Sequence, residues 1–200
     1  MPDTGAPYFI PFADPTDLVR DWPALSEDVA EAVADGLDAA GGLVAVKSAI
    51  FTGIQDASVL AGDNLTVTDL EITHALADAS NKLIISAFLG SAANSEGRAQ
   101  VGIAVHDGTE LIAIADADGS RTRVTAGGAS SATGAVFVTT NPSVTFVHTP
   151  NTTDSRTYTV RAINIEANTR TLHINRADQD NNEIRRQRAV SSLVIQEVKV

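Results

Sequence analysis

The fold class is decided by residues 156–175, RTYTVRAINIEANTRTLHIN. Two runs in this stretch, Arg156 to Ile165 and Arg170 to Asn175, are rich in Thr, Val and Ile. Branched side chains of this kind fit the pleated surface of a strand. The polar residues between the two runs favour a turn. The stretch therefore predicts two β-strands joined by a short connection.

Similar runs extend from Leu43 to Val200 and are separated by Gly, Asn, Asp and Ser at intervals of roughly ten residues, which is typical of an all-β sandwich or barrel. The Asp-Gly pair at residues 107–108 predicts a hairpin, and Asn141-Pro142 predicts a second tight reversal. The expected strands are 43–52, 64–73, 82–89, 100–106, 110–115, 122–125, 135–140, 143–148, 156–165, 170–175 and 191–198. The predicted fold class is mainly β, with an antiparallel β-sandwich head over residues 43–200.

The last expected strand, SSLVIQEV at residues 191–198, sets Leu193, Ile195 and the nearby Val198 against Ser and Gln. We expect these three apolar side chains to form its buried face. A chain that ends in a strand usually has that end tied into a sheet, so we expect this strand to be paired.

The first 25 residues form a separate region. They hold five of the seven prolines, which keep a segment extended, and four aromatic side chains, which are costly to expose unless they dock against something. We predict an extended arm that anchors residues 1–25 to another protein; a disordered terminus is the alternative. The aromatic residues are Tyr8, Phe9, Phe12 and Trp22.

A short helix is predicted between arm and head, within residues 26–42. Ser26 supplies an N-cap hydroxyl, acids follow in the first turn, and Gly41-Gly42 ends the pattern after Ala40. One thin apolar stripe makes a lone helix of this length marginal in water, so it must pack on its own head or on copies of itself around an axis. We favour the second, a trimerisation stem. The stripe consists of Val29, Val33, Leu37 and Ala40.

Composition excludes several classes of protein. With 25 acidic and 14 basic residues the formal net charge is −11, so nucleic acid is not an expected partner. The absence of Cys excludes disulfides and thiolate metal sites. The N-terminus lacks the pattern of a secretory signal, and no stretch approaches the ~20 apolar residues that span a bilayer, so we expect a cytosolically made protein without membrane insertion.

Four histidines are candidate metal ligands, but they fall in separate expected strands or turns without HxH or HExxH spacing. We therefore predict polar strand residues rather than a metal site. The alternative is an ion held on a three-fold axis by symmetric copies of His106 or His148. The other two histidines are His74 and His173.

Two loops carry acids at alternate positions, as calcium loops do. The first, with Asp116 and Asp118, lacks the closing Glu, and the second, with Asp178, Asp180 and Glu183, lacks the central Gly. Because Asp and Asn also make turns, we favour turns and predict no bound metal and no cofactor.

Local basic runs occur at residues 185–188, which hold Arg185, Arg186 and Arg188, and at Arg121 and Arg123. We expect these arginines to pair with acids of neighbouring subunits or to be solvated; binding of an anionic sugar is the alternative. Gly127-Gly128 is expected to be a loop. No Ser/His/Asp order, paired Glu or phosphate loop is evident, so we predict no enzyme activity and no catalytic residues.

Two regions resemble bacteriophage virion proteins. YFIPFADPTDLVRDWPALSEDVAEAV, residues 8–33, resembles the N-terminus of many phage minor structural proteins, in which an ADPTDLVRDWP-like phrase precedes a capped helix. Residues 82–198 resemble the C-terminal head of many phage fibre proteins, through NKLIISAFLG, VHDGTELIAIADADGSRTRVTAG, TPNTTDSRTYTVRAINIEANTRTLHINRADQDN and SSLVIQEV. Together these regions cover about three quarters of the chain.

The resemblance implies a jelly-roll-like head of the kind found in trimeric fibre tips, set on a virion-attached stem. Such proteins occur as tail fibres, tail-tip components and fibres or spikes on the capsid. We therefore expect a homotrimeric virion protein, either a short tail fibre or spike whose head contacts a host-surface glycan or protein, or a capsid head fibre or decoration protein. A long fibre would have a repetitive shaft, and here one helix separates arm from head, so the object should be short.

Overall fold

A computed structural model describes residues 31, 42–95, 100–128, 139–182, 184 and 187–200. These residues form a mainly β structure of antiparallel sheets, which confirms the mainly-β part of the predicted fold class. The predicted arm and the helix from Ser26 to Ala40 lie outside the described residues, apart from Glu31, whose backbone is helical. The division into arm, stem and head therefore stays a prediction.

Twelve strands are present among the described residues. They are β1 (Leu43–Phe51), β2 (Gln55–Val59), β3 (Asn64–His74), β4 (Lys82–Phe88), β5 (Ala93–Asn94), β6 (Val101–His106), β7 (Leu111–Ile112), β8 (Ala126–Gly127), β9 (Ser143–His148), β10 (Arg156–Asn164), β11 (Arg170–Ile174) and β12 (Ser191–Val198).

The strands form three antiparallel sheets. A four-stranded sheet has the order β1-β12-β4-β9, and a five-stranded sheet has the order β3-β10-β6-β7 with β8 also paired to β6. A small third sheet has the order β2-β11-β5. Within the two larger sheets the pairing is nested: β1 pairs with β12, β3 with β10, β4 with β9 and β6 with β7. The first half of the described chain therefore pairs with the second half in reverse order, and the successive pairs lie alternately in the four-stranded and the five-stranded sheet.

One hydrophobic core joins the two larger sheets. It includes Leu83 and Leu193 from the four-stranded sheet and Ile103 and Val160 from the five-stranded sheet, all with no exposed surface. Burial of a side chain of this size contributes about 1.5–3 kcal/mol. Alternation along β4 and β12 points every second side chain into this core, because successive side chains point to opposite faces. In β6 and β10, consecutive residues are buried.

Alternation in β12 corrects one prediction. The strand lies between β1 and β4, so the expected pairing of the C-terminal strand is confirmed. Leu193 and Ile195 are buried as predicted, but Val198 is half-exposed and Glu197, 1% exposed, takes the next inward position. Strict period two places residue 197 inward, and the predicted Val198 lies one step out of phase.

Most of the long predicted strands are confirmed to within one residue. The strand predicted over 110–115 is shorter, because Ala113 has a positive φ of 52° and leaves the β region of backbone conformation after Ile112. The strand predicted over 122–125 is wrong; a short strand follows it at Ala126–Gly127. Of residues 135–140 only the last two are described, and Thr140 forms a bridge with Ala92. The strands β2 and β5 were not predicted.

The two predicted turns differ in outcome. The Asp107-Gly108 hairpin joins β6 to β7, with Gly108 at a φ of 96° and the Asp107 N–H donating to the Glu110 carbonyl at 3.0 Å. Asn141-Pro142 is not a reversal. It continues alongside residues 89–91, where the Pro142 carbonyl accepts from Leu89 at 3.0 Å and the Asn141 side chain accepts from the Ser91 N–H at 2.7 Å.

Gly127-Gly128 is also not a free loop. Gly127 belongs to β8, opposite Gly102 on β6, and the Gly128 N–H donates to the Val101 carbonyl at 3.2 Å. A Cβ on Gly128 would overlap the side chain of Thr140. A close approach of two chain segments therefore requires glycine at this position.

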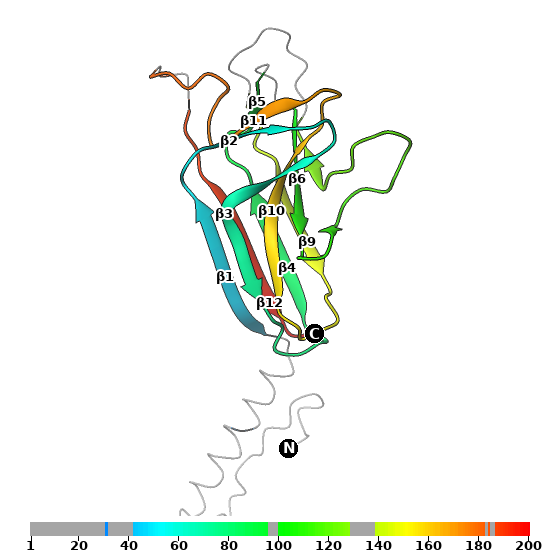
Figure 1. The fold of residues 1–200 in the computed structure, drawn as a ribbon. Helices are drawn as coiled ribbons and strands as arrows, with labels where there is room; N and C mark the ends of the chain where they lie inside the picture. The colour runs from blue at the N-terminus through cyan, green and yellow to red at the C-terminus, as the bar shows by residue number, and fades with distance from the viewer. Residues whose placement is uncertain (1–30, 32–41, 96–99, 129–138, 183, 185–186) are drawn as a thin grey trace, which may run out of the picture.

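The head has two distinct ends (Figure 1). The described chain enters the four-stranded sheet at Leu43, beside the end of β12, where the Lys199 N–H donates to the Gly42 carbonyl at 2.9 Å. The small sheet β2-β11-β5 lies at the opposite end (Figure 1). We call this opposite end the cap; it is formed by β2, β5 and β11 and residues 175–182.

Candidate functional site

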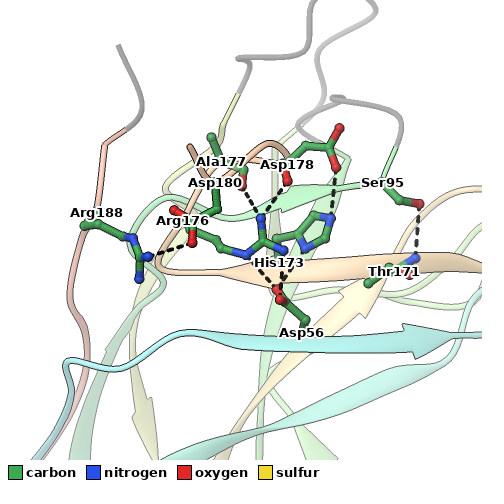
Figure 2. A network of polar contacts seen from close by, with 9 residues as sticks. All are labelled: Asp56, Ser95, Thr171, His173, Arg176, Ala177, Asp178, Asp180 and Arg188. Carbon is green, nitrogen blue, oxygen red and sulfur yellow. Dashed lines mark hydrogen bonds and ion pairs between the residues drawn. The ribbon is translucent and has the colours of Figure 1, made fainter. Parts of the chain in front are cut away.

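A polar network at the cap ties β2 to the segment that follows β11 (Figure 2). Its centre is Asp56 on β2, which lies directly opposite His173 on β11 in the register of the small sheet. Arg176 follows β11, after the chain has turned at Asn175, whose φ is 64°. Pairing of β2 with β11 and this turn therefore bring the three side chains together.

The Asp56 carboxylate contacts the side chains of Arg176 and His173. Arg176 donates through Nε to Oδ1 at 2.9 Å and through Nη2 to Oδ2 at 2.8 Å, the two-pronged geometry that gives arginine–carboxylate pairs their strength. The His173 Nδ1 lies 2.8 Å from Asp56 Oδ1. Partial burial alone would raise the pKa of Asp56, but the hydrogen bonds and charges of Arg176 and His173 lower it below its ordinary value.

The same network holds Ala177 and Asp178 in place. Arg176 donates through Nη1 to the carbonyls of Ala177 and Asp178, at 2.9 Å and 2.6 Å. The Asp178 carboxylate lies 3.1 Å from the second ring nitrogen of His173, without the alignment of a hydrogen bond. Because a carboxylate faces each ring nitrogen, His173 cross-links two segments of the cap.

A second polar cluster is buried beneath the four-stranded sheet, near the end where the chain enters. The Glu197 carboxylate accepts from Asn81 Nδ2 at 2.6 Å and from the Ala77 N–H at 2.8 Å, and it lies 2.8 Å from His74 Nε2. Burial alone would raise the pKa of Glu197, but the hydrogen bonds from Asn81, Ala77 and His74 lower it. The cluster anchors the connection between β3 and β4 to the last strand.

A third cluster surrounds the hairpin between β6 and β7. The Asp107 carboxylate accepts from the Thr109 N–H at 2.9 Å, the Thr109 hydroxyl at 2.6 Å and the Glu110 N–H at 3.0 Å, and it pairs with Arg156. Burial opposes ionisation, yet these bonds hold the pKa of Asp107 well below its usual range. The turn is therefore locked by its own aspartate.

The four predicted histidine candidates have different hydrogen-bond and packing partners. His74 and His173 belong to the buried cluster and the cap network. His106 accepts from the Gly108 N–H at 3.0 Å, and His148 stacks edge-on against Tyr158 with ring centroids 6.0 Å apart. Burial lowers the pKa of His148. Across the part of the chain that the structure describes, no three His, Cys, Asp or Glu side chains are grouped as metal ligands are.

One acid in each candidate calcium loop pairs with an arginine of its own chain. Asp118 pairs with Arg121 at 2.7 Å in an exposed turn, and Gly119 there has a φ of 58°. Asp180 pairs with Arg188 at 2.6 Å. Asp116 and the other acids do not converge with them on a shared point within the described ranges, and Glu183 is not described.

The basic runs find intramolecular partners where they are described. Besides the pairs of Arg121 and Arg188, Arg123 donates from Nε to the Ala115 carbonyl at 2.6 Å. The expected pairing with neighbouring subunits is thus not needed to satisfy these three side chains. Arg185 and Arg186 lie outside the described residues.

The chain matches no protein-family model and no curated protein. Among the described residues, no helix is long and apolar enough to cross a membrane. The function therefore has to be inferred from the chain itself.

Asp56 and Arg176 were not singled out from the sequence. Asp56 lies in QDASV, a strand with little β-branched content, and Arg176 is 120 positions away from it. Glu197, in contrast, could have been found, since the alternation of SSLVIQEV places it inward.

Proposed function

We propose that this chain is a structural protein of a bacteriophage virion, a short homotrimeric tail fibre, spike or tail-tip component whose β head projects from the particle. The resemblance of residues 8–33 to phage anchoring segments and of residues 82–198 to phage fibre heads supports this proposal.

The observation that carries the proposal is that the head has two different ends (Figure 1). The segment preceding Leu43, which holds the predicted arm and stem, joins the head at one end, and the cap lies at the other. The nine residues of β1 separate the two ends by roughly 26 Å at ~3.3 Å per residue. A head attached through its N-terminal segment would thus present the cap outward.

The strand order supports a jelly-roll-like sandwich. Its eight principal strands pair first with last, second with second-last and so on, in two sheets that share one core. Jelly rolls recur in viral structural and carbohydrate-binding proteins. A host-surface glycan or protein is accordingly the ligand class we propose for the cap, whose side chains are held rigid by the Asp56 network (Figure 2).

The shortness of the predicted stem favours a second candidate, a capsid head fibre or decoration protein. One helix of residues 26–42 leaves little length to extend the head from the particle. In that case the head would stiffen the shell, and host contact would be absent.

Deletion of residues 1–25 tests the proposal. We expect the shortened chain to stay soluble with a folded head but to be missing from purified particles of the phage that encodes it. Incorporation of the shortened chain at the wild-type level would refute the anchoring role.

Deletion of the whole gene distinguishes the two candidates. Loss of adsorption to host cells with unchanged particle stability would support the tail fibre or spike. Loss of particle stability on heating, with unchanged adsorption, would support the decoration protein.

A further inference from the structure

The outward face of the four-stranded sheet carries exposed apolar side chains on either side of a middle row formed by Ser48, Val194, Ser86 and Thr145. Cross-strand register aligns Val46, Gln196, Ile84 and Val147 in one row and Ile50, Ser192, Phe88 and Ser143 in another. Val46, Ile50 and Val147 are each more than half exposed. We call the surface formed by Val46, Ile50, Ile84, Phe88, Val147 and Val194 the apolar face.

Charge is almost missing from this face, although the chain carries a formal net charge of −11. Among the described outward positions of the four strands, Lys82 is the one charged residue and no acid is present. A net charge of one sign opposes association of copies, and the opposition is weakest where the contacting surfaces carry no acid. The apolar face is therefore a surface on which a second copy can approach with little local like-charge repulsion.

The outward face of the five-stranded sheet provides an internal comparison. Its rows hold Glu71 opposite Thr159, Thr73 opposite Thr157, and Arg161, which donates to Thr66. Thr73 and Thr157 share a hydrogen bond of 3.0 Å between their hydroxyls. The β3 side of this polar outer face is thus exposed and charged, while Thr159 and Ala104 farther into the sheet are buried. The outward face of the four-stranded sheet carries no acid.

The predicted stem meets the head at the sheet that bears the apolar face. Gly42 accepts from Lys199, beside the end of β12, and Leu43 begins β1 at the edge of that sheet. Stems that associate around a common axis would bring the heads together on this side.

The area of the apolar face can be compared with the area that a stable interface buries. Four strands about 4.8 Å apart, each about seven residues long, cover roughly 19 by 23 Å, or about 440 Å². This area includes the polar side chains of the face, so the apolar surface itself is smaller. A stable interface needs about 800 Å² from each partner, so the face alone would not suffice and the proposed contact requires a further contribution from the predicted stem.

We propose that the apolar face is the contact surface between copies of this chain. This inference rests on the proposed homotrimer and goes beyond it by assigning the head surface that the copies bury. Val46 and Val147, on the two edge strands of the sheet, lie within that surface.

Thiol labelling of the full-length chain tests the assignment, because the chain has no Cys and an introduced thiol is the sole reactive one. Val46→Cys and Val147→Cys place it on the apolar face, and Thr73→Cys places it on the polar outer face as a matched control. We expect maleimide labelling of the first two to be at least about tenfold slower than that of the control, since access governs the rate. Equal rates in an oligomeric protein would overturn the assignment.

A charge-insertion variant gives a second, independent readout. Val46→Glu combined with Val147→Glu should raise the dissociation midpoint in dilution-series sedimentation by about 100-fold, because burying unpaired charges at an interface carries that penalty. Thr73→Glu should leave the midpoint unchanged, and an unchanged far-ultraviolet dichroism spectrum shows that the head still folds. A double variant that assembles like wild type would overturn the assignment.

The mass of the wild-type assembly in solution distinguishes failure of the proposed homotrimer from failure of the proposed contact surface. A wild-type monomer would refute the homotrimer and, with it, the assignment. A trimer with freely labelled face cysteines would refute the assignment alone. A dimer with protected face cysteines would support the assignment and refute the three-fold assembly.

Discussion

Replacement of Glu197 by Leu tests how far the fold depends on a charge buried beneath the four-stranded sheet. The carboxylate, 1% exposed, accepts from Asn81, Ala77 and His74. Leucine has a similar size and lacks the acceptors. The substitution therefore removes the hydrogen bonds without opening a large cavity.

The expected loss in the free energy of unfolding follows from the buried groups that would lose the Glu197 carboxylate as their hydrogen-bond partner. Asn81 and His74 are buried, and a buried donor without an acceptor costs about 1–3 kcal/mol. The apolar side chain regains part of this through burial, so we expect a net loss of about 3 kcal/mol in the free energy of unfolding. In a chain of this size that lowers the melting temperature by roughly 6–12 °C.

Urea unfolding followed by circular dichroism measures the loss. Glu197→Gln, which keeps one carbonyl acceptor, should lose about half as much as Glu197→Leu. Glu71→Leu makes the same chemical change at an exposed position of β3 and should stay within about 0.5 kcal/mol of wild type. If Glu197→Leu were as stable as Glu71→Leu, the inward carboxylate would not hold the fold as inferred.

Four further predictions concern stability and assembly. Asn175→Ala should lower the free energy of unfolding in urea by about 3 kcal/mol. The Asn175 side chain donates hydrogen bonds to two backbone carbonyls and accepts one from the Ser191 hydroxyl, and the Asn175 backbone has a positive φ. Folding lowers the pKa values of Glu197 and Asp56, so both carboxylates stabilise the folded protein fully above their unfolded-state pKa values, near pH 4. This stabilisation should be lost as the pH falls further. Melting measured against pH should therefore show a smaller loss of stability in acid for Glu197→Gln than for wild type. Burial raises the pKa of Tyr158 from 10.0 to about 12, so stability should fall as the pH rises through that interval, and Tyr158→Phe should remove this part of the alkaline loss in the same assay. Val33→Asp, in the stripe of the predicted stem, should weaken assembly in sedimentation while the head stays folded; an intact trimer would place the helix elsewhere.

Several long strands, such as β4 and β12, could be predicted from the sequence because they bury one face of an alternating pattern. β12 illustrates this, since its period of two fixes its inward residues and needs no knowledge of its partners. The short strands could not be predicted, because two residues such as Ala93–Asn94 carry no periodicity. Their pairing is set by the long strands around them.

The cap network could not be predicted from the sequence for a different reason. Asp56 and His173 meet because β2 and β11 pair, and this pairing joins segments 117 positions apart. The turn that directs Arg176 toward Asp56 depends on the positive φ of Asn175, which is stabilised by bonds to the end of β1. Both conditions belong to the tertiary structure.

Cryo-electron microscopy of the phage particle tests the central claim most directly. The account predicts three copies of the β head around a common axis on the particle surface, with apolar faces turned toward one another and the β2-β11-β5 caps pointing away from the attachment point. Particles that lack the head altogether, while the chain is abundant in the infected cell, would contradict a structural role in the virion.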